Sequence, residues 1–568
     1  MIYSREPIIE KDGIKIFSEE DFYWQRSITR DQIKSLQKEL DSQPIMGAAT
    51  KVGINPGYIS TYHRADMIYF LPYQTGADFS VLDLGAGFGN ITIPIAKKMP
   101  EAQIYAVDAS LDILGVASKQ ARWEKCSNID FIKTDIVEKK NLPFKEKSFD
   151  LIIMNGVLEW VGAGTTVGNP REHQVEVLLY LKSLLKENGS LYIGIEGRFF
   201  PGYFTKVRDP HSGLRFTSVL PRKIADWWCR KNGMAGYRTY IYSHPGYSKL
   251  FKEAGFDTQK METIYPVASY KDPYFLFSYG DKTAYNFAFN KIAKEIFPAP
   301  RGRFLFQFLY YLGLEKFFAP SYLFILNNKE SNNGRRLLDH KVGDWVDMTK
   351  YEPIKVFGNL ANFGSSSFWL IDKETKAPKY AVKIKRNLSD DENMMRKVEK
   401  LLSFNLPQAV LPIKYNNDTQ LFEFINGKIL ETNAESIEKA IYVIKDIHFK
   451  NPGLIHGDYT LANILKDGES YKIIDWDDYA ESESQFFDVC SLIIHYFFIL
   501  KHLPVNSTRE ILTSPKVLAW FKKYDERIKM EDLPTIWQSF LKHSVEWYEN
   551  RRQSKYNFYS SILKIMIK

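Results

Sequence analysis

Three residues in the C-terminal half have the types and spacing that phosphoryl transfer requires. Asn463 follows Asp458 by five positions, and Asp475 stands at the end of a short apolar run. Phosphoryl transfer needs an acceptor hydroxyl held in line and magnesium ions that neutralise charge on the phosphates. Asp458 would orient and deprotonate the hydroxyl, and Asn463 and Asp475 would supply the oxygen ligands that magnesium prefers. The pattern predicts a catalytic Asp458, Mg²⁺ ligands at Asn463 and Asp475, and ATP as the donor.

A glycine-rich turn in the N-terminal half has the features of a nucleoside-cofactor site. Gly85, Gly87 and Gly89 follow a strand-like run that contains Asp83, and a helix-like run comes next. Glycines permit a tight turn and let the backbone approach a ligand closely. Asp108 ends the next predicted strand, where a carboxylate can accept hydrogen bonds from both ribose hydroxyls. The alternative is a structural turn with no ligand.

The spacing of the glycines separates two cofactor classes. The dinucleotide fingerprint is G-x-G-x-x-G, whereas this loop is G-x-G-x-G preceded by Asp83. It resembles the loop of class I methyltransferases that use S-adenosylmethionine (SAM), and the likeness covers roughly residues 60–260. The segment 196–256 also resembles methyltransferases found with bacterial polysaccharide biosynthesis genes. The resemblance implies Gly85, Gly87 and Gly89 at the methionine end, Asp108 at the ribose, Asp135 beside the adenine amine, and Asn155 to Glu159 facing the reacting methyl group.

The sequence leaves the base for methyl transfer open. A hydroxyl acceptor often needs a base, but a softer nucleophile needs only proximity. The candidates are Glu159, Glu196, Tyr203 and His211. A loop contact or a satisfied polar group is the alternative reading of each one.

The segment from about residue 345 to 568 resembles the aminoglycoside phosphotransferase and choline kinase family. The motifs that match are His456-Gly457-Asp458, Asn463, Ile474-Asp475-Trp476-Asp477 and Phe487-Asp488-Val489. Asp488 is usually structural in that family. No A-P-E motif follows, so the resemblance implies a small-molecule or glycan acceptor rather than a protein.

Upstream residues would complete a nucleotide site. Lys383 lies where a kinase β3 lysine pairs the α- and β-phosphates, and Glu399 is its expected partner, with Glu392 as second choice. Gly358 and Gly364 lie in a predicted strand–turn–strand whose backbone could approach phosphates. This glycine loop matches the family poorly. The sequence therefore also admits a kinase-like domain without activity.

The order of predicted elements indicates two domains. Strands alternate with helices in the first half, which favours a Rossmann-like, doubly wound α/β methyltransferase domain. A bilobal, protein-kinase-like α+β domain should follow. The polar, Asn-rich stretch 327–336 resembles a linker. We predict an N-terminal extension at 1–60, the methyltransferase domain at 61–326, a linker at 327–344 and the kinase-like domain at 345–568.

Bulk composition constrains partners and compartment. The 568-residue chain has a net charge of +8, which favours anionic partners, although a basic enzyme is equally consistent. Three isolated cysteines and the lack of an apolar leader predict a cytoplasmic protein. The basic tail 551–568 could lie on the inner face of a membrane or pack on the kinase-like domain. We expect no nucleic-acid partner.

The combined prediction is a bifunctional enzyme that uses SAM, ATP and Mg²⁺. Both reactions could modify a glycan, a lipid-linked saccharide or a small molecule. The plan resembles methyltransferase–kinase enzymes of bacterial surface polysaccharide biosynthesis. The alternatives are an aminoglycoside- or choline-type kinase with an accessory methyltransferase, and a regulatory protein in which one domain senses its cofactor.

Overall fold

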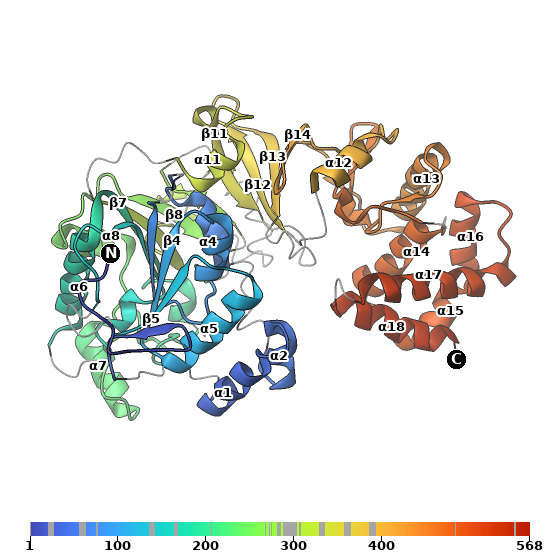
Figure 1. Ribbon diagram of the computed structural model, residues 1–568. Helices are drawn as coiled ribbons and strands as arrows, with labels where there is room; N and C mark the ends of the chain where they lie inside the picture. Colours follow the sequence, from blue (N-terminus) through green and yellow to red (C-terminus); the bar gives the residue numbers. More distant parts are fainter. Residues whose placement is uncertain are drawn as a thin grey trace. The chain divides into compact units, whose positions relative to one another are not determined.

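The structure is a computed structural model, and it divides into two compact units, Met1–Asn387 and Leu388–Lys568. Each unit is described by itself below (Figure 1). The structure describes residues 2–20, 28–55, 59, 64–74, 76, 78–135, 142–163, 168–205, 207–266, 269–271, 273, 275–280, 284, 286–287, 304–305, 308–309, 311–328, 335–356, 365–385, 394–482, 484, 486–549 and 553–567.

A mixed sheet forms the centre of the first unit. Its strands lie in the order β1-β2-β5-β4-β3-β6-β7-β10-β8-β9-β11-β12-β13. From β2 to β7 the neighbouring strands are parallel, and β10 runs antiparallel to both β7 and β8. The strands are β1 (Ile9–Lys11), β2 (Ile14–Ile16), β3 (Ser80–Leu84), β4 (Gln103–Asp108), β5 (Ile129–Lys133), β6 (Phe149–Asn155), β7 (Leu185–Glu196), β8 (Glu262–Pro266), β9 (Leu276–Ser278), β10 (Ser321–Asn327), β11 (Tyr351–Val356), β12 (Ser365–Asp372) and β13 (Pro378–Lys385).

Helices cover both faces of this sheet, so the central strands are apolar on both sides. In β6, for example, Leu151, Ile152 and Ile153 are all fully buried. Near-continuous apolar runs are typical of parallel strands covered on two faces. Helices α4 and α5 lie on one face, and α6 and α8 lie on the other (Figure 1). The helices of this unit are α1 (Arg30–Glu39), α2 (Ile45–Lys51), α4 (Thr92–Lys98), α5 (Leu111–Trp123), α6 (Pro170–Leu184), α7 (Arg222–Lys231), α8 (His244–Glu253) and α11 (Leu337–Val342).

Two details differ from the sequence expectations. The apolar spacing of residues 175–189 and the glycine at their end predict a helix over this range, but α6 ends at Leu184 and the chain continues directly as β7 from Leu185. Residues 185–188 therefore belong to β7 and not to a last helical turn. The N-terminal extension belongs to the same unit, because β2 pairs in parallel with β5.

The units divide at a different place from the predicted linker at 327–344. Asn327 ends β10 and pairs with Ser190 of β7. Arg336 forms an ion pair with Glu352 at 3.1 Å, at the start of α11. Both ends of the Asn-rich stretch thus contact the first unit. The predicted domain boundaries stay predictions about where each family begins.

A buried polar network joins the hairpin β11–β12 to the rest of the first unit. The Lys355 Nζ lies 3.2 Å from the Asp66 Oδ2 and donates a hydrogen bond to the Pro273 carbonyl. The Ser366 hydroxyl donates to the Asp66 Oδ1 at 2.5 Å. Asp66, Lys355 and Ser366 are each at most 1% exposed. The strands that the sequence assigned to the kinase-like domain therefore share a core with the N-terminal unit.

The second unit is mostly helical after a short β-rich segment. Its apolar core includes Ile444, Trp476 and Trp537. Its helices are α12 (Met394–Leu402), α13 (Ala434–Lys450), α14 (Phe487–Ile494), α15 (Thr508–Leu512), α16 (Pro515–Tyr524), α17 (Leu533–Tyr548) and α18 (Gln553–Ile567). Its strands are β14 (Lys414–Tyr415), β15 (Thr419–Glu423), β16 (Lys428–Ile429), β17 (Leu454–Ile455), β18 (Ile464–Asp467), β19 (Ser470–Ile473) and β20 (Ala480–Glu481).

Helix α18 contains most of the basic tail. Its residues Tyr559, Ile562 and Met566 are buried in the core of the second unit. This packing favours the last helix of a folded unit over a helix on a membrane surface. Among the described residues, no helix combines the length and apolar character needed to cross a membrane.

Candidate functional site

The glycine-rich turn joins β3 to α4 at the carboxyl edge of the parallel strands. Gly85, Gly87 and Gly89 have φ angles of 71°, 56° and 80°. Residues with a side chain rarely adopt such angles. A side chain at position 85 would also clash with its neighbour, because a Cβ on Gly85 would lie 2.4 Å from the Val157 Cγ2. The backbone of this turn can therefore approach a ligand closely.

Asp108 holds the turn from the neighbouring strand. Its Oδ2 accepts a hydrogen bond of 2.9 Å from the Gly87 N–H, and its Oδ1 accepts one of 3.0 Å from the Ser110 N–H. A carboxylate oxygen can accept more than one hydrogen bond, as the predicted contact with ribose would require. Asp83 is buried below the turn, and its Oδ2 accepts from the Thr92 hydroxyl at 2.5 Å. Burial raises the pKa of Asp83 to about 6.

The other predicted cofactor residues lie along the same edge. Asp135 is half-buried two residues after the end of β5, and Asn155 ends β6. The Asn155 Oδ1 accepts a hydrogen bond of 3.4 Å from the Tyr192 hydroxyl. The fold thus brings the predicted SAM residues to the ends of β3, β4, β5 and β6. Ligands of open α/β sheets bind at this edge.

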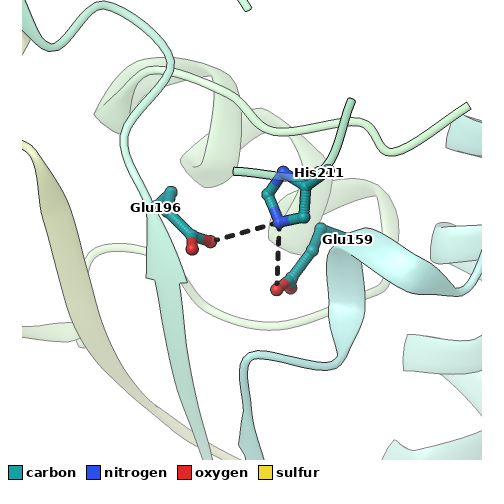
Figure 2. A group of neighbouring side chains, drawn as sticks. All are labelled: Glu159, Glu196 and His211. Carbon is teal, nitrogen blue, oxygen red and sulfur yellow. Dashed lines mark ion pairs between the residues drawn. The ribbon is translucent and has the colours of Figure 1, made fainter. Parts of the chain in front are cut away.

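A buried cluster lies beside the turn and contains three of the four candidate bases. Figure 2 shows Glu159, Glu196 and His211 with their polar atoms turned toward one another. The His211 Nε2 lies 3.6 Å from the Glu159 Oε1 and 3.7 Å from the Glu196 Oε2. Glu159 is fully buried, His211 is 3% exposed and Glu196 is 8% exposed. The distances are too long for hydrogen bonds, so these ion pairs are loose.

The cluster is close to the cofactor turn through two contacts. Glu159 comes two residues after Val157, whose side chain fills the space next to Gly85. The Tyr270 hydroxyl lies 2.6 Å from the position that a Cβ on Gly156 would take, and it donates to the Glu196 Oε1 at 3.2 Å. Tyr203, the fourth candidate, is buried in the same unit with a pKa held above its ordinary value by burial.

Burial and charge oppose each other in this cluster. Burial acts to lower the pKa of His211, but Glu159 and Glu196 raise that pKa above its ordinary value. Burial raises the pKa of Glu159, and the charge of Glu196 adds to the increase. Burial also acts to raise the pKa of Glu196, but Lys271 and His211 hold it below its ordinary value. The two carboxylates therefore favour a positive charge on His211.

A family comparison identifies the domain that contains the turn. The family model described as "Methyltransferase domain" matches residues 76–198, which include β3 to β7 and the whole glycine turn. Residues 76–198 form a methyltransferase domain. The predicted Rossmann-like methyltransferase fold of the N-terminal region is confirmed.

Relatives of this methyltransferase domain act on different acceptors. The malonyl-[acyl-carrier protein] O-methyltransferase of Halalkalibacterium halodurans is 32% identical over 130 residues, which are 23% of this chain and 42% of that protein. The trans-aconitate 2-methyltransferase of Rhodococcus jostii is 26% identical over 185 residues, which are 33% of this chain and 61% of that protein. The chain thus spans less than two thirds of either relative.

A solved structure of Haemonchus contortus phosphoethanolamine N-methyltransferase 2 with S-adenosyl-L-methionine is 14% identical to this chain over the matched residues. The match covers 53% of this chain and 58% of that one, with a TM-score of 0.29. A likeness at this level carries no argument about the acceptor.

The second unit brings the predicted phosphoryl-transfer residues together. The Asn463 Nδ2 donates a hydrogen bond of 2.9 Å to the Asp458 carbonyl. The Asn463 carbonyl accepts one of 2.9 Å from the N–H of Ile474, the residue before Asp475. Asp475 has a left-handed conformation with φ of 66°. A non-glycine residue in this region marks a position that the surrounding structure enforces.

Asp488 fixes the loop that carries Asp458. Its carboxylate accepts hydrogen bonds from the N–H of His456 at 2.7 Å and from that of Gly457 at 3.0 Å. The fully buried carboxylate also lies 3.1 Å from the His448 Nε2. Asp488 therefore has the structural role that the kinase resemblance implies.

The nucleotide residues predicted upstream do not form one described group. Gly358 and Gly364 lie outside the described residues. Lys383 is half-buried on β13 of the first unit, where it pairs with Ser367 of β12. Glu399 is exposed on α12 of the second unit. The predicted pairing of Lys383 with Glu399 stays a prediction.

Sequence reasoning missed the partners of both sites. Lys271 lies 3.3 Å from the Glu196 Oε1, and Lys555 lies 2.8 Å from the Asp458 Oδ1. Asp209 caps the turn that carries His211, through a hydrogen bond of 3.0 Å from the His211 N–H. None of these residues belongs to a motif. Only the Asp209-Pro210-His211 turn could have been a signal, because aspartate often caps the backbone two residues on.

Proposed function

We propose that the N-terminal unit transfers a methyl group from SAM to an oxygen atom of its acceptor. The observation that carries the proposal is the turn in which Gly85, Gly87 and Gly89 all have positive φ and Asp108 bonds the Gly87 N–H. SAM would place its methionine part on this turn and its ribose on Asp108. Asp135 would lie beside the adenine amine, and Asn155 near the methyl group.

Methyl transfer in this arrangement depends mainly on proximity and orientation. The acceptor oxygen must approach the methyl carbon from the side opposite the sulfur atom. The buried cluster of Glu159, Glu196 and His211 follows the ends of β6 and β7, beside the turn. It would therefore lie on the acceptor side of the methyl group. Its polar atoms can orient an acceptor hydroxyl, whose proton leaves to solvent.

The proposed acceptor is a glycan, a lipid-linked saccharide or a small molecule. The named acceptors of the two curated relatives differ from each other, so these relatives support methyl transfer without selecting an acceptor. The test is to incubate the full chain with methyl-labelled SAM and a panel of these three acceptor classes. Labelled product should form with one class and fall at least about 100-fold in Asp108→Ala, because a mispositioned cofactor loses orientation. Equal labelling by this variant would contradict the site.

We also propose a second activity, ATP-dependent phosphoryl transfer by the second unit. Its specific support is the arrangement of Asp458, Asn463 and Asp475 around one hydrogen-bonded loop. Asp458 would orient the acceptor hydroxyl, and Asn463 and Asp475 would bind Mg²⁺. Lys383, Glu399, Gly358 and Gly364 stay the residues that the sequence predicts for the nucleotide.

The two activities would make the chain a bifunctional enzyme of bacterial surface polysaccharide biosynthesis. Incubation with γ-labelled ATP and the same acceptors tests this proposal. A product that receives both labels would support bifunctional modification. Phosphorylation of an aminoglycoside or choline alone would favour the small-molecule kinase. ATP or SAM binding without any turnover would favour a regulatory protein.

A further inference from the structure

We infer that Glu159, Glu196 and His211 form a site for a divalent first-row transition metal. The three side chains can offer one imidazole nitrogen and two carboxylate oxygens, and these atoms lie within 4.8 Å of one another. Their origins differ: Glu159 follows β6, Glu196 ends β7, and His211 lies in the loop after β7 (Figure 2). The fold thus assembles this ligand set from three separate segments.

The spacing suits a metal ion better than direct ion pairs. Zinc binds imidazole nitrogen and carboxylate oxygen at about 2.0–2.2 Å, so two tetrahedral ligands lie about 3.4 Å apart. The His211 Nε2 lies 3.6 Å and 3.7 Å from the two carboxylate oxygens. Both distances exceed the range of a hydrogen bond. Small side-chain movements would close each of them around one cation.

The buried polar atoms of the cluster point independently to a missing ligand. Both oxygens of Glu159, the Oε2 of Glu196 and both ring nitrogens of His211 are buried without a hydrogen-bond partner among the described residues. Burying a carboxylate without a partner is strongly unfavourable. A protein retains such a group when a cation offsets that cost. Three of these atoms, the Glu159 Oε1, the Glu196 Oε2 and the His211 Nε2, are the ones that face one another across the cluster.

The charged groups around the cluster carry two more negative than positive charges when His211 is neutral. Glu159, Glu196 and Asp209 are the carboxylates that act on His211. Lys271 is the ammonium group next to Glu196. Even with His211 protonated, three carboxylates face only two cations. A neutral His211 together with a divalent metal would balance the charge.

Neighbouring groups are placed as partners of metal ligands usually are. The Asp209 Oδ1 lies 3.8 Å from the His211 Nδ1, on the ring atom opposite the one that faces the two glutamates. Carboxylates in this position orient metal-binding histidines. Tyr270 and Lys271 both contact the Oε1 of Glu196, which leaves its Oε2 facing His211. Mixed imidazole and carboxylate ligands favour Zn²⁺, Mn²⁺ or Fe²⁺ over Mg²⁺.

The chemical role of this metal rests on the proposed methyl transfer, although its binding does not. A metal with only three protein ligands keeps an open position. An acceptor hydroxyl bound there would lose its proton more easily. In the transfer, the C–S bond of SAM breaks and sulfur keeps the electron pair. The new O–CH₃ bond forms, and the hydroxyl proton leaves to solvent.

Metal binding can be measured without any acceptor. The full chain is stripped with a chelator, incubated with Zn²⁺ or Mn²⁺, dialysed and analysed by elemental mass spectrometry. We expect about one equivalent per chain. Co²⁺ should also give visible absorption bands of a protein-bound site. Wild-type protein that retains none of these metals and gives no Co²⁺ bands would overturn the inference.

Variants separate the site from adventitious binding. Glu159→Gln keeps the side-chain volume and should weaken metal binding at least about 100-fold, and Asp209→Asn about 10- to 100-fold. The matched controls are Glu172→Gln, which is exposed on α6, and His173→Gln, on the same helix. Both controls should bind as wild type does. If Glu159→Gln and His211→Gln both bind the metal as tightly as wild type does, the site is contradicted.

Calorimetric titration of the metal-free protein with SAM gives an independent readout. If the protein binds SAM but no metal, the metal site is wrong and the proposed methyl transfer stands. If it binds a metal but no SAM, the proposed methyl transfer is wrong and the metal site stands.

Discussion

The Nζ of Lys555 lies 2.8 Å from the Oδ1 of Asp458, and so it joins the last helix, α18, to the predicted catalytic loop. The same lysine lies over the ring of Tyr548, 4.9 Å from its centroid. The Tyr548 hydroxyl donates a hydrogen bond of 3.2 Å to the carbonyl of Gly457. Two consecutive helices, α17 and α18, therefore hold the loop that carries Asp458.

The first prediction concerns this loop. Asp458→Asn should lower phosphoryl transfer at least about 100-fold, the usual scale of general-base assistance. ATP and Mg²⁺ should still bind. Labelled-phosphate transfer, or slow ATP hydrolysis before an acceptor is known, measures the effect. Lys555→Met should have a smaller effect, and Lys564→Met, which is exposed on α18, should have none. Wild-type transfer by Asp458→Asn would show that this loop is not catalytic.

The second prediction separates the metal ligand from the base. Asp475→Asn removes a carboxylate that would bind the Mg²⁺ bridging the β- and γ-phosphates. It should therefore weaken Mg²⁺–ATP binding as well as turnover, unlike Asp458→Asn. Calorimetry with Mg²⁺–ATP measures this difference. Asp478→Asn, three residues further on, is the control. If Asp475→Asn binds Mg²⁺–ATP as tightly as wild type and Asp478→Asn do, Asp475 is not a metal ligand.

The third prediction concerns the buried pair of Lys355 and Asp66. Lys355→Met leaves a buried carboxylate uncompensated and should lower the free energy of unfolding by about 3–5 kcal/mol. The double change Asp66→Asn with Lys355→Met should recover part of that loss. Chemical denaturation followed by circular dichroism measures both.

Lys350→Met provides the surface control for this pair. Lys350 is 69% exposed and lies 3.7 Å from Asp347. Its replacement should change the free energy of unfolding by less than about 1 kcal/mol. An equal effect of the two lysine replacements would show that the buried pair does not hold β11 in the first unit.

The fourth prediction concerns pH. Burial, with a contribution from Lys316, lowers the pKa of His244 to about 4. Between its ordinary pKa of about 6.5 and pH 4, the unfolded chain binds a proton that the folded chain does not. The stability contributed by neutral His244 is thus complete above pH 6.5 and is lost as the pH falls toward 4. The loss should be on the order of 2–3 kcal/mol.

Urea midpoints measured at several pH values test whether stability falls with pH in this way. The His244→Gln variant should lose less stability than wild type between pH 6.5 and 4. His502→Gln, at an exposed position, should follow the wild-type curve. If His244→Gln has the wild-type dependence on pH, burial of a neutral His244 does not contribute to it.

The cofactor turn could be predicted from the sequence because its information is local. Gly85, Gly87 and Gly89 follow a short apolar run, and Asp108 ends the next one. In parallel strands such residues meet at one edge of the sheet. The observed hydrogen bond from the Gly87 N–H to Asp108 joins the two predicted elements directly.

The buried cluster could be predicted only in part. Glu159, Glu196 and His211 were separate candidates, and nothing in their spacing requires that they meet. Their contact depends on the path of the loop after β7, which Asp209 fixes through backbone hydrogen bonds. Composition likewise gives no sign of the pairing of Asn327 or of the ion pair of Arg336, because both are long-range contacts.

The most direct test of the central claim is a calorimetric titration of the full chain with SAM. The account predicts micromolar binding by wild type, at least about tenfold weaker binding by Asp108→Ala, which loses one charge-assisted acceptor, and little binding by Gly87→Val. Gly13→Val carries the same strain at a φ of 77° with open space around it, and should bind SAM normally. Preference for NAD over SAM, or equal SAM binding by wild type and Asp108→Ala, would contradict the account.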